Sequence, residues 1–392
     1  MQPSMFVSSW EAGASRDFCR RGGMNVSGPQ GSAAGADRIF TLLERGRERQ
    51  ASDLYVEPGQ GAAYRIYTEV ERVVGASFEA ADVSAFLDET IDKLSRGRLD
   101  KIGIADAVYA DERVGSIRIH ASRGKHGARL TIRLLARSIP ELETLGHPRV
   151  INTFTELRSG LIIFAGPTGS GKSTTIASLL DRINATSAKH IVTFEDPIEY
   201  RHRWSRSVVT QYEVGRDVAT YADGVRGALR ADPDVLFIGE LRGVETAAAC
   251  LQAAETGHLV FAALQTSSEM AQAVNRIVGL FPAEEQDNAR SRLADMLRAL
   301  VGLRLLPRRD RMGLRAVAEI AIVDEPIRRL IREGASHQLR SAIASGKSEG
   351  SQTLEMHLSE LVAAGEISLA AAQAASAYPG EVREPPKRFP AR

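Results

Sequence analysis

Residues 161–180, LIIFAGPTGSGKSTTIASLL, constrain the fold of this chain more than any other stretch. An apolar run typical of a buried strand leads into a glycine-rich turn, and a helical pattern follows. Gly166, Gly171, Lys172 and Ser173 match the spacing G-x4-G-K-S of a phosphate loop. In such a loop, backbone N–H groups and a helix N-terminus surround phosphate oxygens, the lysine reaches the β- and γ-phosphates, and the serine hydroxyl binds Mg²⁺. The predicted binding residues are Gly166, Pro167, Thr168, Gly169, Ser170, Gly171, Lys172, Ser173 and Thr174.

Three further short apolar runs follow the loop and alternate with helical stretches. They are HIVTFE (190–195), VLFIG (235–239) and LVFAAL (259–264). Strands that are apolar along their whole length are typical of a parallel sheet covered by helices on both faces. The fold class predicted for this region is therefore α/β, with the ligand at the carboxyl ends of the strands.

Polar side chains stand at each of those strand ends. Glu195 and Asp196 end the first run, Glu240 follows the second, and Gln265 ends the third. We expect Glu240 to be the catalytic base, and we expect Glu195 and Asp196 to orient the attacking water and the metal shell. Ser173, Asp196 and Glu240 are the predicted Mg²⁺ ligands, partly through water. The alternative for Glu195 and Asp196 is capping of a turn before Pro197.

Arginines in the first part of the chain are candidates for neutralising the charge that develops on a transferred phosphoryl group. Strand alternation places Arg118 on one face of SIRIHA, and Arg129 and Arg133 on one face of RLTIRL. The alternative is a solvent-facing surface. His258, before the last apolar run, is a further candidate at the nucleotide-proximal sheet edge, with an ordinary structural histidine as its alternative.

The length of 392 residues and the changes in composition along the chain predict several regions. They are a disordered leader (1–36), a small α/β domain (37–140), a linker (141–150), a larger domain (151–376) and a disordered tail (377–392). From about residue 282 we expect helices, including one long helix over AEEQDNARSRLADMLRALVGL (283–303). The basic stretch 303–315 is expected to be a solvated loop or hairpin.

Composition narrows the class of protein. The net charge of +1 gives no overall positive field that would attract nucleic acid. The sequence also lacks the alternation of aromatic and basic residues typical of a nucleic-acid groove, so no direct nucleic-acid binding is expected. Two distant cysteines exclude a disulfide framework and fit a reducing compartment. No apolar run approaches the roughly 20 residues of a membrane span. We therefore expect a cytoplasmic protein, with a possible peripheral position at a membrane.

Taken together, these motifs resemble the type II/IV secretion ATPases, and among them the ATPases of type IV pilus retraction and twitching motility. The matching stretches include ASDLYVEPG, GPTGSGKSTT, HIVTFEDPIEY, ADPDVLFIGELRGVETAAACLQAAETGHLVF and RIVGLFPAEEQ, and the resemblance runs from about residue 38 to 376. It implies an N-terminal PAS-like domain, a RecA-like domain that hydrolyses ATP with Mg²⁺, and C-terminal helices. It also implies a homohexameric ring that docks on an inner-membrane platform protein.

The resemblance extends to single residues. Glu195 falls on the acidic box, Glu240 on the Walker B glutamate and His258 on the first histidine of the histidine box. Arg118 and Arg133 fall on trans-acting arginines. Gln265 falls on a γ-phosphate sensor position where the family usually has histidine.

Three departures from the family pattern, Tyr55, Gly243 and Gln265, keep alternatives open. One alternative is a secretion or conjugation motor of the same family, and another is a hydrolysis-impaired regulatory ring partner. A third is a nucleic-acid motor on a RecA-like core, which the charge argues against.

Overall fold

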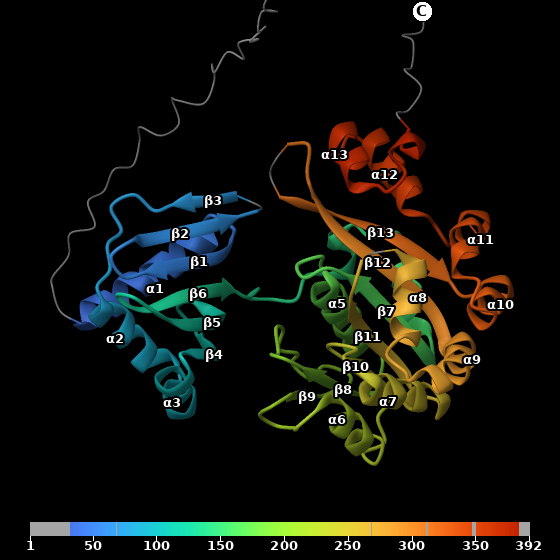
Figure 1. The fold of residues 1–392 in the computed structure, drawn as a ribbon, viewed down its shortest axis with the longest axis horizontal. Helices are drawn as coiled ribbons and strands as arrows, with labels where there is room; N and C mark the ends of the chain where they lie inside the picture. Colours follow the sequence, from blue (N-terminus) through green and yellow to red (C-terminus); the bar gives the residue numbers. More distant parts are fainter. Residues whose placement is uncertain (1–31, 68, 268, 311–312, 347–349, 384–392) are drawn as a thin grey trace, which may run out of the picture. The chain divides into compact units, whose positions relative to one another are not determined.

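A computed structural model describes residues 32–67, 69–267, 269–310, 313–346 and 350–383 (Figure 1). The chain divides into two compact units, one ending at Leu134 and one beginning at Leu135. Most of the predicted leader lies outside the described residues, but residues 32–36 form the start of helix α1 (Ser32–Glu48), so the leader prediction is wrong there.

The N-terminal unit is an antiparallel sheet with helices on one face. The sheet order is β3-β2-β1-β6-β5-β4, and its strands are β1 (Ala51–Glu57), β2 (Gly61–Ile66), β3 (Glu69–Arg72), β4 (Ile104–Asp111), β5 (Gly115–Gly124) and β6 (Gly127–Leu134). Buried side chains of the strands, such as Ile119 of β5, form one core with Ile39 of α1 and Phe86 of α2 (Ala80–Thr90). Two helices stand between β3 and β4, α2 and α3 (Lys93–Ile102), and Asp92 caps α3 by accepting a hydrogen bond from the Ser95 N–H at 2.7 Å.

The second unit is built on a seven-stranded sheet, in the order β13-β12-β7-β11-β10-β8-β9. Its parallel strands are β7 (Gly160–Gly166), β8 (His190–Glu195), β9 (Val208–Glu213), β10 (Val235–Ile238), β11 (Leu259–Gln265) and β12 (Leu297–Pro307). β13 (Leu314–Ile322) pairs antiparallel with β12 at the edge. The predicted apolar strands are thus all present, and the α/β class is confirmed.

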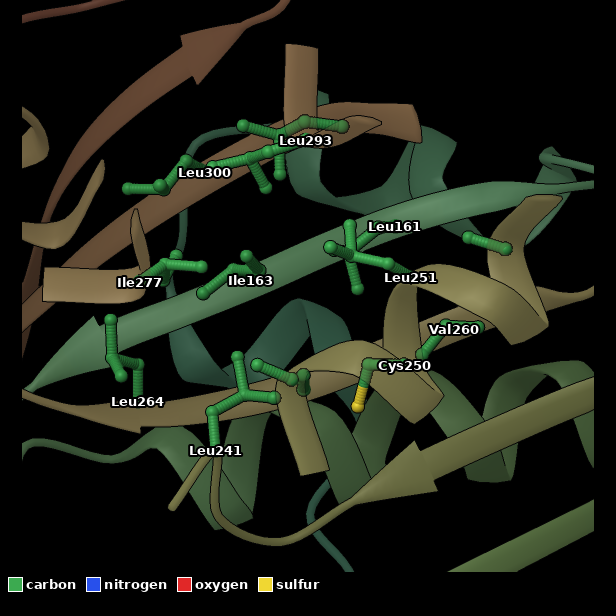
Figure 2. Close-up of a cluster of buried hydrophobic side chains, with 14 of the residues drawn as sticks. Leu161, Ile163, Leu241, Cys250, Leu251, Val260, Leu264, Ile277, Leu293 and Leu300 are labelled. Atoms are coloured by element: carbon green, nitrogen blue, oxygen red, sulfur yellow. The ribbon is translucent and has the colours of Figure 1, made fainter. Parts of the chain in front are cut away.

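Alternate side chains of these strands enter two separate cores. Leu161 and Ile163 of β7 pack on one face, beneath α6 (Tyr221–Ala228), α7 (Val244–Glu255), α8 (Met270–Val278), α9 (Gln286–Met296), α10 (Glu325–Arg332) and α11 (Leu339–Ser345). Figure 2 shows part of this core, with Leu161, Leu251 and Leu293 converging from β7, α7 and α9. Ile162 and Phe164 pack on the other face with α4 (Val150–Thr153) and α5 (Lys172–Thr186). Burial of both faces explains why these strands lack a polar alternation.

The long helix predicted over 283–303 is wrong in its second half. α9 ends at Met296, and the chain continues directly as β12 beside β7. Leucines at helical spacing suggested one helix, but Val301 and Leu303 are fully buried in the sheet, where tertiary pairing overrides local propensity. The basic stretch 303–315 covers the ends of β12 and β13 and the turn between them, so the expected hairpin is confirmed.

The last part of the chain packs against β13. The helices expected in this part of the chain include α12 (Leu354–Ala363) and α13 (Leu369–Ala375), whose buried residues share a core with Val317. Residues 379–381 form a 3-10 turn and Val382 is buried, so the disordered-tail prediction is wrong up to Arg383; residues 384–392 lie outside the described part. Among the described residues, none of the helices has the length and hydropathy needed to cross a membrane.

Candidate nucleotide site

The phosphate loop joins β7 to α5 as the sequence predicts. Gly166 has φ 153°, and a Cβ there would lie 2.5 Å from the Leu303 carbonyl oxygen of β12. Gly171 has φ 93° and is the N-cap of α5. Both positions require glycine, one for close approach of two strands and one for backbone conformation. The loop therefore places the first amides of α5 at the carboxyl end of β7, where a phosphate would meet the positive end of the helix.

Lys172 is nine-tenths buried at the start of α5. Its ammonium donates hydrogen bonds to the carbonyl oxygens of Gly166 and Pro167, both at 2.8 Å. Burial lowers the pKa of Lys172, and the nearby carboxylates of Glu199 and Glu240 oppose that shift. This electrostatic coupling means that Glu240, from the end of β10, lies in the neighbourhood of the lysine.

Glu195, at the end of β8, is a buried carboxyl. Its Oε1 accepts hydrogen bonds from Thr193 Oγ1 at 2.8 Å and from Gln211 Nε2 at 3.1 Å. Burial raises the pKa of Glu195 to about 7, and the two hydrogen bonds only partly offset this. The side chain is therefore poised between its two protonation states near neutral pH, as is common in active sites.

Asp196 and Glu240 lie around the Tyr221 hydroxyl. Asp196 is exposed and Glu240 is half-buried. The pKa of Tyr221 is raised first by burial and then by the charges of Asp196, Glu240 and Glu195, in that order. The three strand-end carboxyls predicted from the sequence are thus brought together at one edge of the sheet.

A second layer of polar residues was missed by the sequence reasoning. Gln211 of β9 donates to Glu195 and also to the Tyr200 carbonyl at 2.8 Å, and the Tyr200 hydroxyl lies 2.8 Å from Thr174 Oγ1 in the phosphate loop. One signal was available: Thr193 is a polar residue inside an apolar strand, two positions before Glu195 and directly opposite Gln211.

Gln265 ends β11 directly opposite Gly166 of β7. Its side chain is exposed and, with Thr168 and Ser170, lines a cavity of about 740 Å³ that also meets Arg304 of β12. The Ser170 hydroxyl is buried and has no hydrogen-bond partner among the described residues. The predicted sensor position therefore adjoins the phosphate loop.

The prediction that His258 lies at the nucleotide-proximal edge is wrong: within the sheet of the second unit, this residue lies at the end far from the phosphate loop. His258 precedes β11, and Gly160, at the start of β7, donates its N–H to the His258 carbonyl. Gln265 and the loop lie at the other end of that strand, about 20 Å away at the usual rise per residue. The ring instead contacts the Ala253 carbonyl at 2.9 Å and Thr256 Oγ1 at 3.0 Å, as an ordinary structural histidine does.

The candidate arginines share one face of the N-terminal sheet. Arg118 of β5 lies directly opposite Arg133 of β6. Arg133 forms an ion pair with the buried Asp53 at 3.1 Å, and Arg129 forms one with Glu57 at 2.7 Å. Arg118 reaches Asp106 only at 4.0 Å, so it is the least constrained of the three.

The residues at the strand ends suit a magnesium ion. Mg²⁺ prefers carboxylate, hydroxyl and water oxygens. Ser173 follows Lys172, Glu240 lies near that lysine, and Asp196 lies with Glu240 near Tyr221, so all three can supply such oxygens. Within the described part of the chain, no group of three or more His, Cys, Asp or Glu side chains is arranged to hold a metal by itself. A magnesium ion here would therefore depend on a nucleotide's phosphates and on water for its remaining ligands.

A phosphate loop in a parallel sheet, with carboxyls at the neighbouring strand ends, defines a P-loop nucleotide-binding protein of the RecA-like class. The chain belongs to the type II/IV secretion system protein family, an ATPase family whose model matches residues 39–378.

Three relatives show where in the family it lies. It is 38% identical over 330 residues to the protein named type IV pilus retractation ATPase PilT of Pseudomonas aeruginosa, covering 84% of this chain and 95% of the relative. It is 35% identical to a twitching motility protein of Neisseria gonorrhoeae over 309 residues, which are 79% of this chain and 82% of the relative. The crystal structure of the pilus retraction motor PilT with bound ADP superposes with a TM-score of 0.77 at 36% identity, covering 88% of this chain and 98% of that one.

Proposed function

We propose that this chain hydrolyses ATP to power retraction of a type IV pilus, with twitching motility as the cellular result. The observation that carries the proposal is the intact phosphate loop with Glu195 and Glu240 beside it, in a chain similar to PilT along nearly its whole length.

Each residue has a distinct task in this proposal. Lys172 binds the β- and γ-phosphates, and the amides of the loop neutralise phosphate oxygens. Glu240 accepts a proton from the attacking water, because it lies near Lys172 and is half-buried. Asp196 and Ser173 orient the metal shell. Mg²⁺, when bound, would neutralise charge on the phosphate oxygens.

Glu195 and Gln265 support the reaction from two sides. Glu195 is held by Thr193 and Gln211, so its carboxyl keeps one orientation toward the strand ends. Gln265 offers both a hydrogen-bond donor and an acceptor to the γ-phosphate. It lacks the titratable ring of the histidine that the family usually has at this position. The substitution therefore retunes sensing and does not by itself argue for an inactive regulatory partner.

The working unit in this proposal is a homohexamer. Arg118 and Arg133 act in trans, on the nucleotide held by a neighbouring subunit, and Arg118 has the weaker ion pair to give up. We place the ring in the cytoplasm, held at the inner membrane through the platform protein of the pilus machine. No nucleic acid is required as a partner.

The cellular test compares a deletion strain carrying the wild-type gene with one carrying Lys172→Ala. We expect the wild type to restore twitching, and we expect the variant to leave extended pili that do not shorten under the microscope. The same two strains are assayed for protein secretion, because the family includes secretion motors. Normal retraction in the variant with a loss of secretion would replace pilus retraction with a secretion function.

A further inference from the structure

The connecting segment, residues 138–148 near the start of the second unit, runs along one face of the phosphate-loop helix α5. The Ser178 hydroxyl donates to the Pro140 carbonyl at 2.7 Å, Arg182 pairs with Glu143, and His147 contacts Thr175. Positions 175, 178 and 182 recur every three to four residues, which is one face of a helix. The connecting segment is therefore attached to the helix over two turns.

His147 makes the attachment that lies closest to the phosphate loop. Its Nε2 lies 2.8 Å from Thr175 Oγ1, and that hydroxyl donates its only hydrogen to the Gly171 carbonyl at 2.9 Å. With that hydrogen on the carbonyl, which also accepts the Thr175 N–H at 2.9 Å, the imidazole is the donor and its Nε2–H points to the hydroxyl. Two hydrogen bonds in series thus join the connecting segment to the residue that precedes Lys172.

The surroundings of His147 keep the ring in this neutral form. Its Nδ1 is buried and has no hydrogen-bond partner among the described residues. Burial, together with the nearby His357 and Arg315, lowers the pKa of His147 to about 4. At neutral pH the ring therefore carries one hydrogen, on the nitrogen that faces Thr175.

The other side of the connecting segment is also held. Gly146 has φ 67°, and a Cβ on it would lie 1.6 Å from Arg315 Nη1 of β13, which donates to the Leu145 carbonyl at 3.3 Å. Arg315 in turn pairs with Glu366 at 2.5 Å. The backbone at His147 is thus held between α5 and β13, so the imidazole stays in position next to Thr175.

We infer that His147 is a positioning residue for the nucleotide site: through Thr175 it holds the Gly171 carbonyl, and so fixes the turn that presents Lys172 and the first amides of α5 to phosphate. This inference rests on the proposed function of the loop. It links the nucleotide site to residues 138–148, near the start of the second unit.

The test measures affinity for a fluorescent ATP analogue, together with KM and kcat for ATP. His147→Leu removes the donor and should weaken nucleotide binding and raise KM about three- to tenfold, the effect of one lost hydrogen bond, with a smaller change in kcat. His147→Gln keeps an N–H donor at a similar reach and should stay within about twofold of wild type. In a Thr175→Val background, His147→Leu should add no further loss, because both act through one hydroxyl.

Ser178→Ala is the matched control. It removes the hydrogen bond to Pro140 on the same helix face, one turn farther from the loop, and should leave nucleotide affinity unchanged. Equal losses in Ser178→Ala and His147→Leu, or wild-type affinity in His147→Leu, would overturn the inference. Absence of turnover in the wild type would count against the proposed function instead, since relative affinities remain measurable without hydrolysis.

Discussion

Glu195 shows at the scale of one residue how burial prepares a group for function. The carboxyl is only 7% exposed, and desolvation outweighs its two hydrogen bonds, so its pKa rises to about 7. Folding therefore favours the protonated form, and the folded state binds more protons than the unfolded state between about pH 4.5 and pH 7. The contribution of Glu195 to stability is complete below that window and is lost as the pH rises through it.

Glu195→Gln should consequently stabilise the protein at high pH and not at low pH. The amide keeps an acceptor for Thr193 and Gln211 but carries no charge to desolvate. We expect the free energy of unfolding of the variant to exceed that of wild type by up to about 3 kcal/mol near pH 8, and to match it near pH 4. Urea unfolding at several pH values measures this, and a difference that is the same at every pH would refute it.

Arg118 and Arg129 allow a matched comparison on one sheet face. Arg118→Ala should lower ATP turnover at least about tenfold while leaving ATP binding intact, because an arginine finger acts on developing charge. Arg129→Ala, on the same face but paired with Glu57, should change turnover less than about twofold. Equal effects of the two substitutions would remove Arg118 from the finger role.

The sequence allowed prediction of the site residues that stand in one contiguous motif or directly follow an apolar strand. The phosphate loop is one contiguous stretch, and Glu195 and Glu240 directly follow apolar strands, so topology alone brings them to one edge. His147 could not be predicted, because its role depends on a contact with Thr175 that arises from packing. For Gln211 the only sequence signal was the polar Thr193, and the pairing of β8 with β9 that brings the two together is a feature of the fold. His258 was misplaced, because it precedes β11 and so lies at the amino end of that strand, whereas the loop lies at the carboxyl ends.

At the scale of elements, β12 is the part of the fold that local pattern failed to predict. Its leucines fit a helical period, and only the free edge of β7 selects the strand. The strand also shapes the phosphate loop, because the Leu303 carbonyl oxygen would lie only 2.5 Å from a Cβ on Gly166 and so leaves room for glycine alone. The central sheet, by contrast, was predictable because strands buried on both faces have a distinctive continuous apolar pattern.

Leu303→Ala tests the contribution of β12 to stability. Leu303 is fully buried in the core on the α5 face, so the truncation should reduce the free energy of unfolding by about 2–5 kcal/mol. The exposed Leu314 at the start of β13 gives the control, because Leu314→Ala should cost less than about 1 kcal/mol. Chemical denaturation of both variants checks this; similar losses at the two positions would contradict the observed burial.

At the scale of the whole molecule, the proposed trans-acting arginine makes a ring-level prediction. Arg118→Ala and Glu240→Gln subunits are each expected to be nearly inactive alone. Mixed in one ring, a Glu240→Gln subunit supplies Arg118 to the intact Glu240 of its neighbour, so a fraction of turnover should return. ATPase assays across mixing ratios, after dissociation and reassembly, measure this, and strict additivity of the two inactive preparations would exclude action in trans.

The central claim is that this chain hydrolyses ATP through Glu240, and one measurement tests it most directly. Phosphate release at saturating ATP and Mg²⁺ is compared for wild type and Glu240→Gln, with nucleotide binding measured on both. We predict steady turnover by the wild type, and a loss of about a hundredfold or more in the variant with ATP binding retained. A wild type that releases phosphate no faster than Glu240→Gln would contradict the account.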